Sequence, residues 1–303
     1  MTPKPRGLLV PISTPFDPAT GDVAPEVLGA NARAYLDAGV DGILAAGSTG
    51  EAALLSDDEF REVVACLRDA VPGDKLLFVG TGKESTRATI KACRTATDEG
   101  ADYVLVRPPA YYGSTLSPAA LVSHFRRVAD ESPTPVLLYN IPKYTHVALA
   151  DSLLAALAEH PNVVGAKDSS GDIKNFAAYR AAAPGWALFM GNASLYQAAL
   201  DMGAVGGVLA AACFAWSLAL KIGQAFAGKD RVGASAAQET LTPLNKEIVS
   251  TLGVPGIKIA MDVAGLGGGP VRPPLEDLSR KDRTRVADLL RGAGLGALQA
   301  GAR

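Results

Sequence analysis

The chain has 303 residues, 48% of them hydrophobic, and a formal net charge of −2 at pH 7. This is enough apolar material for one large domain, or for a domain with an appendage. Both charge signs are scattered without a basic stripe, which argues against a nucleic-acid or anionic-membrane partner. The cysteines Cys66, Cys93 and Cys213 stand far apart in apolar stretches, which is typical of reduced core thiols in a cytoplasmic protein.

Short apolar runs recur along the chain with amphipathic stretches between them, the pattern of strands and helices that alternate in a parallel sheet. Each run is continuously apolar, as expected of a strand covered on both faces. Eight runs in series favour a closed (β/α)8 TIM barrel over an open sheet. The predicted strands are residues 8–12, 42–46, 76–79, 103–106, 136–139, 163–166, 187–190 and 208–211.

Two connecting segments carry clear signals for the start of a helix. Ser56 and Glu59 stand at capping-box spacing before an amphipathic stretch. Ser117 and Pro118 precede a second one, with proline in the first turn that it favours. These signals support helices between the predicted strands.

The uncharged stretch of residues 202–220 is long enough for a membrane span, but two adjacent glycines interrupt it. We divide it into a buried strand and a helix that starts at about Ala215. Further along, helical patterns follow without convincing strands. The sequence therefore predicts a barrel domain over residues 1–228 and a C-terminal helical region over residues 229–303.

Unusual polar residues fall where predicted strands end. Lys167 closes an apolar run in which an ammonium group has no structural use. Tyr139 ends another run, Ser48 and Thr49 follow a third, and Gly191 follows a fourth. Because the strand ends and the βα loops of a barrel gather on one face, we expect these residues to share a site.

These residue types suit imine chemistry. A lysine in apolar surroundings loses its proton more readily, and the free amine attacks ketones. We expect Lys167 to form a Schiff base with a 2-oxo acid, so that a neighbouring carbon–carbon bond breaks or forms. Tyr139 would relay protons, Ser48 and Thr49 would hold the substrate carboxylate with hydroxyls and backbone N–H groups, and Gly191 would allow close approach of the backbone.

Other interpretations stay open. Lys167 can be solvated or paired with Asp168, Tyr139 can be a core residue with one hydrogen bond, and residues 47–50 alone are an ordinary turn. A phosphate-binding barrel is a further alternative, because residues 191–194 and the later glycine pair suit a phosphate cradle. A metal-dependent aldolase is disfavoured, because the three histidines show no ligand spacing.

Three motifs carry a family resemblance that covers nearly the whole chain: residues 47–51 (Gly-Ser-Thr-Gly-Glu), 139–142 (Tyr-Asn-Ile-Pro) and 165–169 (Gly-Ala-Lys-Asp-Ser). Together they resemble the dihydrodipicolinate synthase / N-acetylneuraminate lyase family of class I aldolases. The resemblance implies a (β/α)8 barrel with C-terminal helices, usually a homotetramer built as a dimer of dimers. It also implies no metal and no organic cofactor.

The same resemblance implies roles for single residues. Lys167 corresponds to the Schiff-base lysine and Tyr139 to the proton relay. A second tyrosine that crosses a dimer interface corresponds to Tyr111 or Tyr112. The candidate substrate-binding residues are Ser48, Thr49, Gly191, Val208 and Ser169.

One departure bears on the substrate. Dihydrodipicolinate synthases have an arginine shortly after the tyrosine motif that grips the carboxylate of aspartate semialdehyde, and Tyr144 stands in that place here. A phenol cannot replace a bidentate guanidinium, although Lys143 is a neighbouring cation. Residues 161–165, 253–258 and 268–275 are similar to 4-hydroxy-2-oxoglutarate aldolase.

We therefore expect a class I aldolase that cleaves or forms a 4-hydroxy-2-oxo acid, with pyruvate and an aldehyde as its partners. The acid would be 4-hydroxy-2-oxoglutarate or a 2-keto-3-deoxy sugar acid. The alternatives are a 4-hydroxy-tetrahydrodipicolinate synthase, a 2-keto-3-deoxy acid dehydratase that uses the same imine, and a sensor that binds a 2-oxo acid without turnover.

Overall fold

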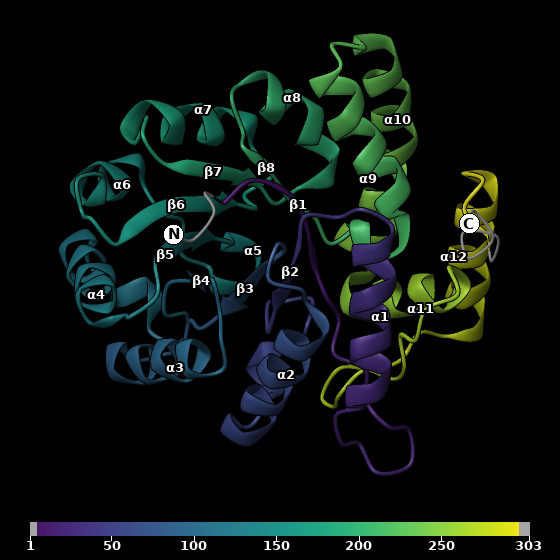
Figure 1. Cartoon of the computed structure of the whole chain (residues 1–303), viewed down its shortest axis with the longest axis horizontal. Helices are drawn as coiled ribbons and strands as arrows, with labels where there is room; N and C mark the ends of the chain where they lie inside the picture. The colour runs from purple at the N-terminus through teal and green to yellow at the C-terminus, as the bar shows by residue number, and fades with distance from the viewer. Residues whose placement is uncertain (1–4, 297–303) are drawn as a thin grey trace.

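The computed structural model describes residues 5–296 and contains eight parallel strands that close on themselves in chain order. The chain is a (β/α)8 barrel, which confirms the predicted fold class (Figure 1). The strands are β1 (Gly7–Pro11), β2 (Gly42–Ala45), β3 (Leu76–Gly80), β4 (Tyr103–Val106), β5 (Val136–Asn140), β6 (Val163–Asp168), β7 (Ala187–Met190) and β8 (Gly206–Val208).

Alternate strand residues face opposite sides of the barrel wall. Outward residues such as Ile43 and Leu77 join the main core between strands and helices. Inward residues such as Leu44, Phe78 and Phe189 form a separate interior cluster, in which the Phe78 and Phe189 rings meet edge-on at 5.6 Å. The interior is thus a packed core, and in a barrel of this kind the substrate site lies at the carboxyl ends of the strands.

The last strand differs from its prediction. β8 spans Gly206–Val208 and not residues 208–211. A Cβ atom on Gly206 would lie 1.9 Å from the Gly7 carbonyl oxygen on β1, so only glycine fits this close strand contact. The glycine pair that we read as an interruption is therefore part of the strand.

The helix after β8 also starts earlier than predicted. α9 spans Ala212–Ala227, and its backbone leaves helical geometry at Ala215, with φ −131° and ψ 38°. The predicted start thus coincides with a kink inside the helix. Among the residues that the structure describes, no helix has both the length and the apolarity needed to cross a membrane.

The predicted helix starts are confirmed. The Ser56 hydroxyl accepts from the Glu59 backbone N–H at 3.1 Å, and the Glu59 carboxylate accepts from the Ser56 N–H at 2.8 Å. Ser117 caps the helix that begins at Pro118. The helices around the barrel are α1 (Pro25–Asp37), α2 (Asp57–Ala70), α3 (Thr86–Asp98), α4 (Pro118–Glu131), α5 (Pro142–Thr145), α6 (Asp151–Leu157), α7 (Ile173–Ala182) and α8 (Tyr196–Asp201), with short turns η1 (Ala52–Leu54), η2 (Gly113–Thr115) and η3 (Ala193–Leu195).

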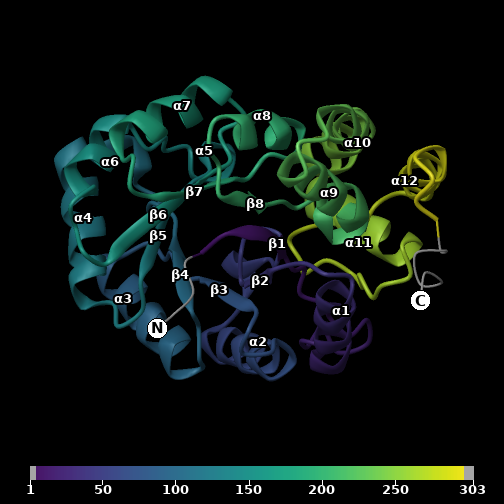
Figure 2. The ribbon, with the colours of Figure 1, turned by 45° about the horizontal axis from the view of Figure 1, so that its top comes forward.

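The C-terminal helices lie on one side of the barrel, beside α9 and α1 (Figure 2). Asn31 on α1 ties this region down, because its side chain donates to the Gly267 carbonyl at 2.7 Å and accepts from the Gly267 N–H at 3.0 Å. The division of the chain at residue 228 stays a prediction. The C-terminal elements are α10 (Arg231–Leu244), η4 (Asn245–Leu252), α11 (Gly253–Val263) and α12 (Arg280–Gly292).

Candidate active site

Lys167 and Tyr139 lie side by side at the carboxyl ends of β6 and β5, where they pair in register. The Lys167 Nζ atom donates to the Tyr139 hydroxyl at 3.2 Å and lies 4.3 Å from the centre of the phenol ring. The two residues are only 4% and 6% exposed. An amine and a phenol therefore meet inside the mouth of the barrel, within reach of proton transfer.

The amine of Lys167 is not neutralised by an acid. Its chain neighbour Asp168 is held elsewhere: Oδ1 accepts from the Asn140 side chain at 2.8 Å, and Oδ2 accepts from the Ser170 hydroxyl at 2.9 Å. No carboxylate in residues 5–296 lies within ion-pair distance of Lys167. The ion pair between Asp168 and Lys167, an alternative interpretation of the sequence, is therefore not formed.

Gly191 brings the loop after β7 against the lysine. A Cβ atom at this position would lie 1.9 Å from the Ser169 hydroxyl oxygen, 2.9 Å from the Asp168 carbonyl oxygen and 3.0 Å from Cε of Lys167. The Gly191 N–H donates to that same Asp168 carbonyl at 2.7 Å. Glycine is thus needed for close packing here, and Ser169 and Gly191 lie directly beside the Lys167 stem.

Ser48 and Thr49 lie in the turn after β2, four strands away from β6 in an eight-stranded barrel. They therefore stand across the mouth from Lys167 and not next to it. The amides of residues 50–52 donate to carbonyls of the same turn, at 3.1 to 3.3 Å, so the turn consumes these donors itself. The donors expected from Ser48 and Thr49 themselves, their hydroxyls and backbone N–H groups, take no part in these turn hydrogen bonds.

Val208 lies at the end of β8 with 1% exposure, in the interior cluster that contains Phe189. Its side chain therefore belongs to the apolar wall below the mouth. Cys213 is a second possible nucleophile, but burial raises the pKa of its thiol to about 12, which keeps it protonated. No group of three or more His, Cys, Asp or Glu side chains in the described chain is arranged to hold a metal ion.

The two residues that follow the tyrosine motif, Lys143 and Tyr144, differ in their surroundings. Tyr144 is 48% exposed, and its pKa is raised by partial burial and by the nearby Tyr139. Lys143 donates from Nζ to the Ser250 carbonyl on η4 at 2.9 Å. The cation that could assist a substrate carboxylate is therefore already bound to the C-terminal region.

Tyr111 and Tyr112 project from the loop after β4 and are 81% and 68% exposed. Their rings pack edge-on at 4.9 Å. Glu84 fixes this loop, because it accepts from the Tyr111 N–H at 2.8 Å and pairs with Arg107 at 2.9 Å. That one of the two tyrosines completes a proton relay across an interface stays a prediction.

Comparison with known proteins agrees with this architecture. A sequence model of the dihydrodipicolinate synthetase family matches residues 4–293. The chain belongs to this family. It is 35% identical over 290 residues to an uncharacterized DapA-like lyase of Halobacterium salinarum, covering 96% of this chain and 94% of the relative. It is 36% identical over 282 residues to a 4-hydroxy-tetrahydrodipicolinate synthase of a Synechococcus strain, covering 92% of each.

Solved structures of the family superpose closely. YagE, an Escherichia coli prophage protein crystallised with pyruvate, gives a TM-score of 0.91 at 28% identity, covering 96% of this chain and 99% of that one. A dihydrodipicolinate synthase of Acinetobacter baumannii, also in complex with pyruvate, gives the same score, identity and coverage. The family consists of lyases and condensing aldolases that work through a Schiff base, and this chain is an enzyme of that class.

A second buried lysine was not recognised from the sequence. Lys258 on α11 is 1% exposed and its Nζ atom lies 2.6 Å from the Glu51 carboxylate, next to the turn that carries Ser48 and Thr49. Burial lowers the pKa of Lys258, and the Glu51 charge opposes that shift. Removing one partner of a buried pair typically costs about 3–5 kcal/mol. Lys258 interrupts an apolar run as Lys167 does, and that signal would have identified it.

Gly191→Ala is expected to lower lyase turnover by about 100-fold, because the new methyl group displaces the Lys167 stem or the Ser169 hydroxyl. The matched control is Gly185→Ala, where a Cβ atom meets nothing within 4 Å. Steady-state kinetics and thermal unfolding of both variants check this. Equal turnover in the two variants would show that space at position 191 does not matter.

Proposed function

We propose that Lys167 is the Schiff-base nucleophile of a pyruvate-dependent class I aldolase. The observation that carries the proposal is a buried amine 3.2 Å from the Tyr139 phenol, without a carboxylate partner in residues 5–296. The amine is thus not engaged in an ion pair and has a proton carrier within hydrogen-bond distance, which is the arrangement that a nucleophile of this kind needs. A purely structural lysine would gain from an acidic partner, as Lys258 does.

In the cleavage direction, the Lys167 amine adds to C2 of a 4-hydroxy-2-oxo acid, and the carbinolamine loses water to give a protonated imine. The proton of the C4 hydroxyl leaves as the electron pair of the C3–C4 bond flows to the imine, which releases an aldehyde and leaves an enamine. Protonation of the enamine at C3 and addition of water at C2 return pyruvate and the free amine. Tyr139 carries the protons in these steps.

The carboxylate of the substrate binds to the hydroxyls and backbone N–H groups of Ser48 and Thr49. Their place on the opposite side of the mouth supports this role, because a 2-oxo acid bound between this turn and Lys167 can direct its carboxylate to the turn and its keto carbon to the amine. Gly191 and Ser169 border the carbonyl, and Val208 forms part of the apolar wall. The site thus turns the carboxylate toward Ser48 and Thr49 and the keto carbon, which is bonded to it, toward Lys167.

The proposed substrate is a 4-hydroxy-2-oxo acid, either 4-hydroxy-2-oxoglutarate or a 2-keto-3-deoxy sugar acid. The pyruvate in two related structures supports pyruvate as the common product. Tyr144 supports a partner other than aspartate semialdehyde, because the arginine expected for its carboxylate is missing at that position. The names of several relatives favour 4-hydroxy-tetrahydrodipicolinate synthase as the second candidate.

Lys167→Arg is expected to reduce pyruvate release to background, because a guanidinium stays protonated and cannot form the imine. Tyr139→Phe is expected to slow both imine formation and carbon–carbon cleavage, so that turnover falls by about 10²–10⁴-fold, the usual contribution of a positioned proton carrier. Pyruvate release coupled to lactate dehydrogenase measures both variants. Wild-type turnover by Lys167→Arg would exclude the Schiff-base mechanism.

A substrate panel separates the candidate reactions. We expect the wild type to release pyruvate from 4-hydroxy-2-oxo acids faster than it condenses pyruvate with aspartate semialdehyde. Tyr144→Arg should raise that condensation by about tenfold, because a bidentate guanidinium binds the carboxylate. Faster condensation by the wild type would favour the synthase. Loss of water without pyruvate release would favour the dehydratase, and binding without turnover would favour the sensor.

The family resemblance also leads us to propose a homotetramer, a dimer of dimers in which Tyr111 or Tyr112 reaches a neighbouring site. The exposure of both rings supports a contact at this loop. We propose a cytoplasmic location from the three unpaired cysteines, two of which are buried.

A further inference from the structure

The turn of residues 47–52 carries the proposed carboxylate-binding hydroxyls and is held in a strained conformation. Near the end of this turn, the backbone of Glu51 has a φ of 55°, in the left-handed region that residues other than glycine rarely adopt. The Glu51 N–H donates to the Ser48 carbonyl at 3.3 Å, and the Thr14 hydroxyl donates to the Gly50 carbonyl at 2.7 Å. Such a conformation persists only where the surroundings fix it.

The surroundings that fix Glu51 come from the C-terminal region. Lys258 Nζ lies 2.6 Å from one Glu51 carboxylate oxygen and also donates to the Pro270 carbonyl at 2.6 Å. The backbone N–H of Arg272 donates to the other carboxylate oxygen at 2.8 Å. Both oxygens of one buried carboxylate are therefore taken by a segment more than 200 residues later in the chain.

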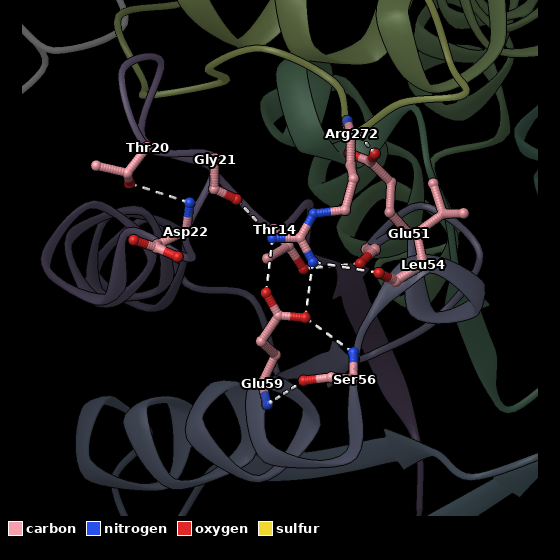
Figure 3. A network of polar contacts seen from close by, with 10 residues as sticks. Thr14, Thr20, Gly21, Asp22, Glu51, Leu54, Ser56, Glu59 and Arg272 are labelled. Atoms are coloured by element: carbon pink, nitrogen blue, oxygen red, sulfur yellow. Dashed lines mark hydrogen bonds and ion pairs between the residues drawn. The ribbon is translucent and has the colours of Figure 1, made fainter.

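Arg272 extends the contact to the α2 end of the loop between β2 and α2. Its guanidinium pairs with Glu59 through two contacts of 2.7 Å and donates to the Leu54 carbonyl at 3.2 Å (Figure 3). It also donates to the Gly21 carbonyl at 2.6 Å, on the loop before α1. Its guanidinium carbon lies 4.1 Å from the centre of the Phe16 ring, and Lys258 Nζ lies 4.4 Å from the same ring.

We propose that Glu51, Lys258 and Arg272 form a clamp through which the C-terminal helices hold Ser48 and Thr49 in the geometry that binds the carboxylate of the 2-oxo acid. These three are positioning residues, because their effect on the substrate passes through the turn. The inference rests on the proposed function of Ser48 and Thr49. It makes the C-terminal region a part of the active site and not an appendage.

The location of the clamp contacts distinguishes a positioning role from a general contribution to the stability of the fold. The clamp contacts converge on Glu51, on Leu54 and on Glu59 in the first turn of α2, all between the turn that carries Ser48 and Thr49 and the start of α2. Asp102 offers the contrasting case: it accepts from the Leu77 N–H at 2.8 Å and pairs with Arg68 at 3.3 Å, at the amino-terminal end of the strands. Its loss should weaken the fold without a change in the turn.

The test compares Glu51→Gln, Lys258→Met and the double variant with the control Asp102→Asn, all in the full chain. The first readout is the pyruvate concentration that gives half-maximal trapping by borohydride, together with the maximal extent of trapping. The second is hydrogen exchange at the amides of residues 50–52, compared with exchange in β2.

The double variant leaves no buried charge unpaired, and the amide oxygen introduced by Glu51→Gln can still accept from the Arg272 N–H. The double variant therefore keeps the test open if a single variant fails to fold.

We expect each folded single variant to raise the half-saturating pyruvate concentration by about tenfold, with maximal trapping near that of the wild type, because carboxylate binding is lost and the amine is intact. The double variant should fall between the wild type and the single variants, and exchange at residues 50–52 should rise in all three. Asp102→Asn should change neither readout.

Half-saturation within twofold of the wild type in the folded clamp variants, or in the double variant alone, would overturn the inference. Unchanged exchange at residues 50–52 would overturn it equally. If the wild type traps no pyruvate, the proposed function fails, and hydrogen exchange alone then decides whether the clamp orders the turn.

Discussion

The described part of this enzyme buries two lysines, and the difference between their partners decides what each can do. Lys258 faces the Glu51 carboxylate at 2.6 Å, so its charge is balanced. Lys167 has the Tyr139 phenol at 3.2 Å and, within the described chain, no acid in ion-pair range. Because burial of an unbalanced ammonium is unfavourable, this contrast is what we expect between a structural cation and a nucleophilic amine.

Closure of the barrel brings other functional residues to the mouth that contains the Lys167 amine. The register of β5 with β6 sets Tyr139 beside Lys167, and the order of strands sets the Ser48 turn across the mouth. Asp168 alternates to the other side of the wall and is held by Asn140 and Ser170, so it does not form an ion pair with the amine of Lys167. The C-terminal helices then fix the far side of the mouth through Glu51. One lysine supplies the proposed chemistry and the other supports its geometry.

Most of this arrangement could be predicted where the signal is local in the chain. Eight apolar runs predicted eight strands, and Lys167 was conspicuous because it ends one of them. Local patterns misplaced β8, since the need for glycine at position 206 comes from the Gly7 backbone on β1 and not from its sequence neighbours. The clamp was missed for a similar reason. Glu51 and Arg272 are 221 residues apart, and no local sequence pattern around either residue predicts their contact.

The central claim is that Lys167 and not Lys258 is the reactive amine, and reductive trapping tests it most directly. The enzyme is incubated with pyruvate and borohydride, digested, and mapped by mass spectrometry. The account predicts one pyruvate-derived adduct, on the peptide that contains Lys167, with Lys258 unmodified. An adduct on another lysine, or none at saturating pyruvate, would contradict it.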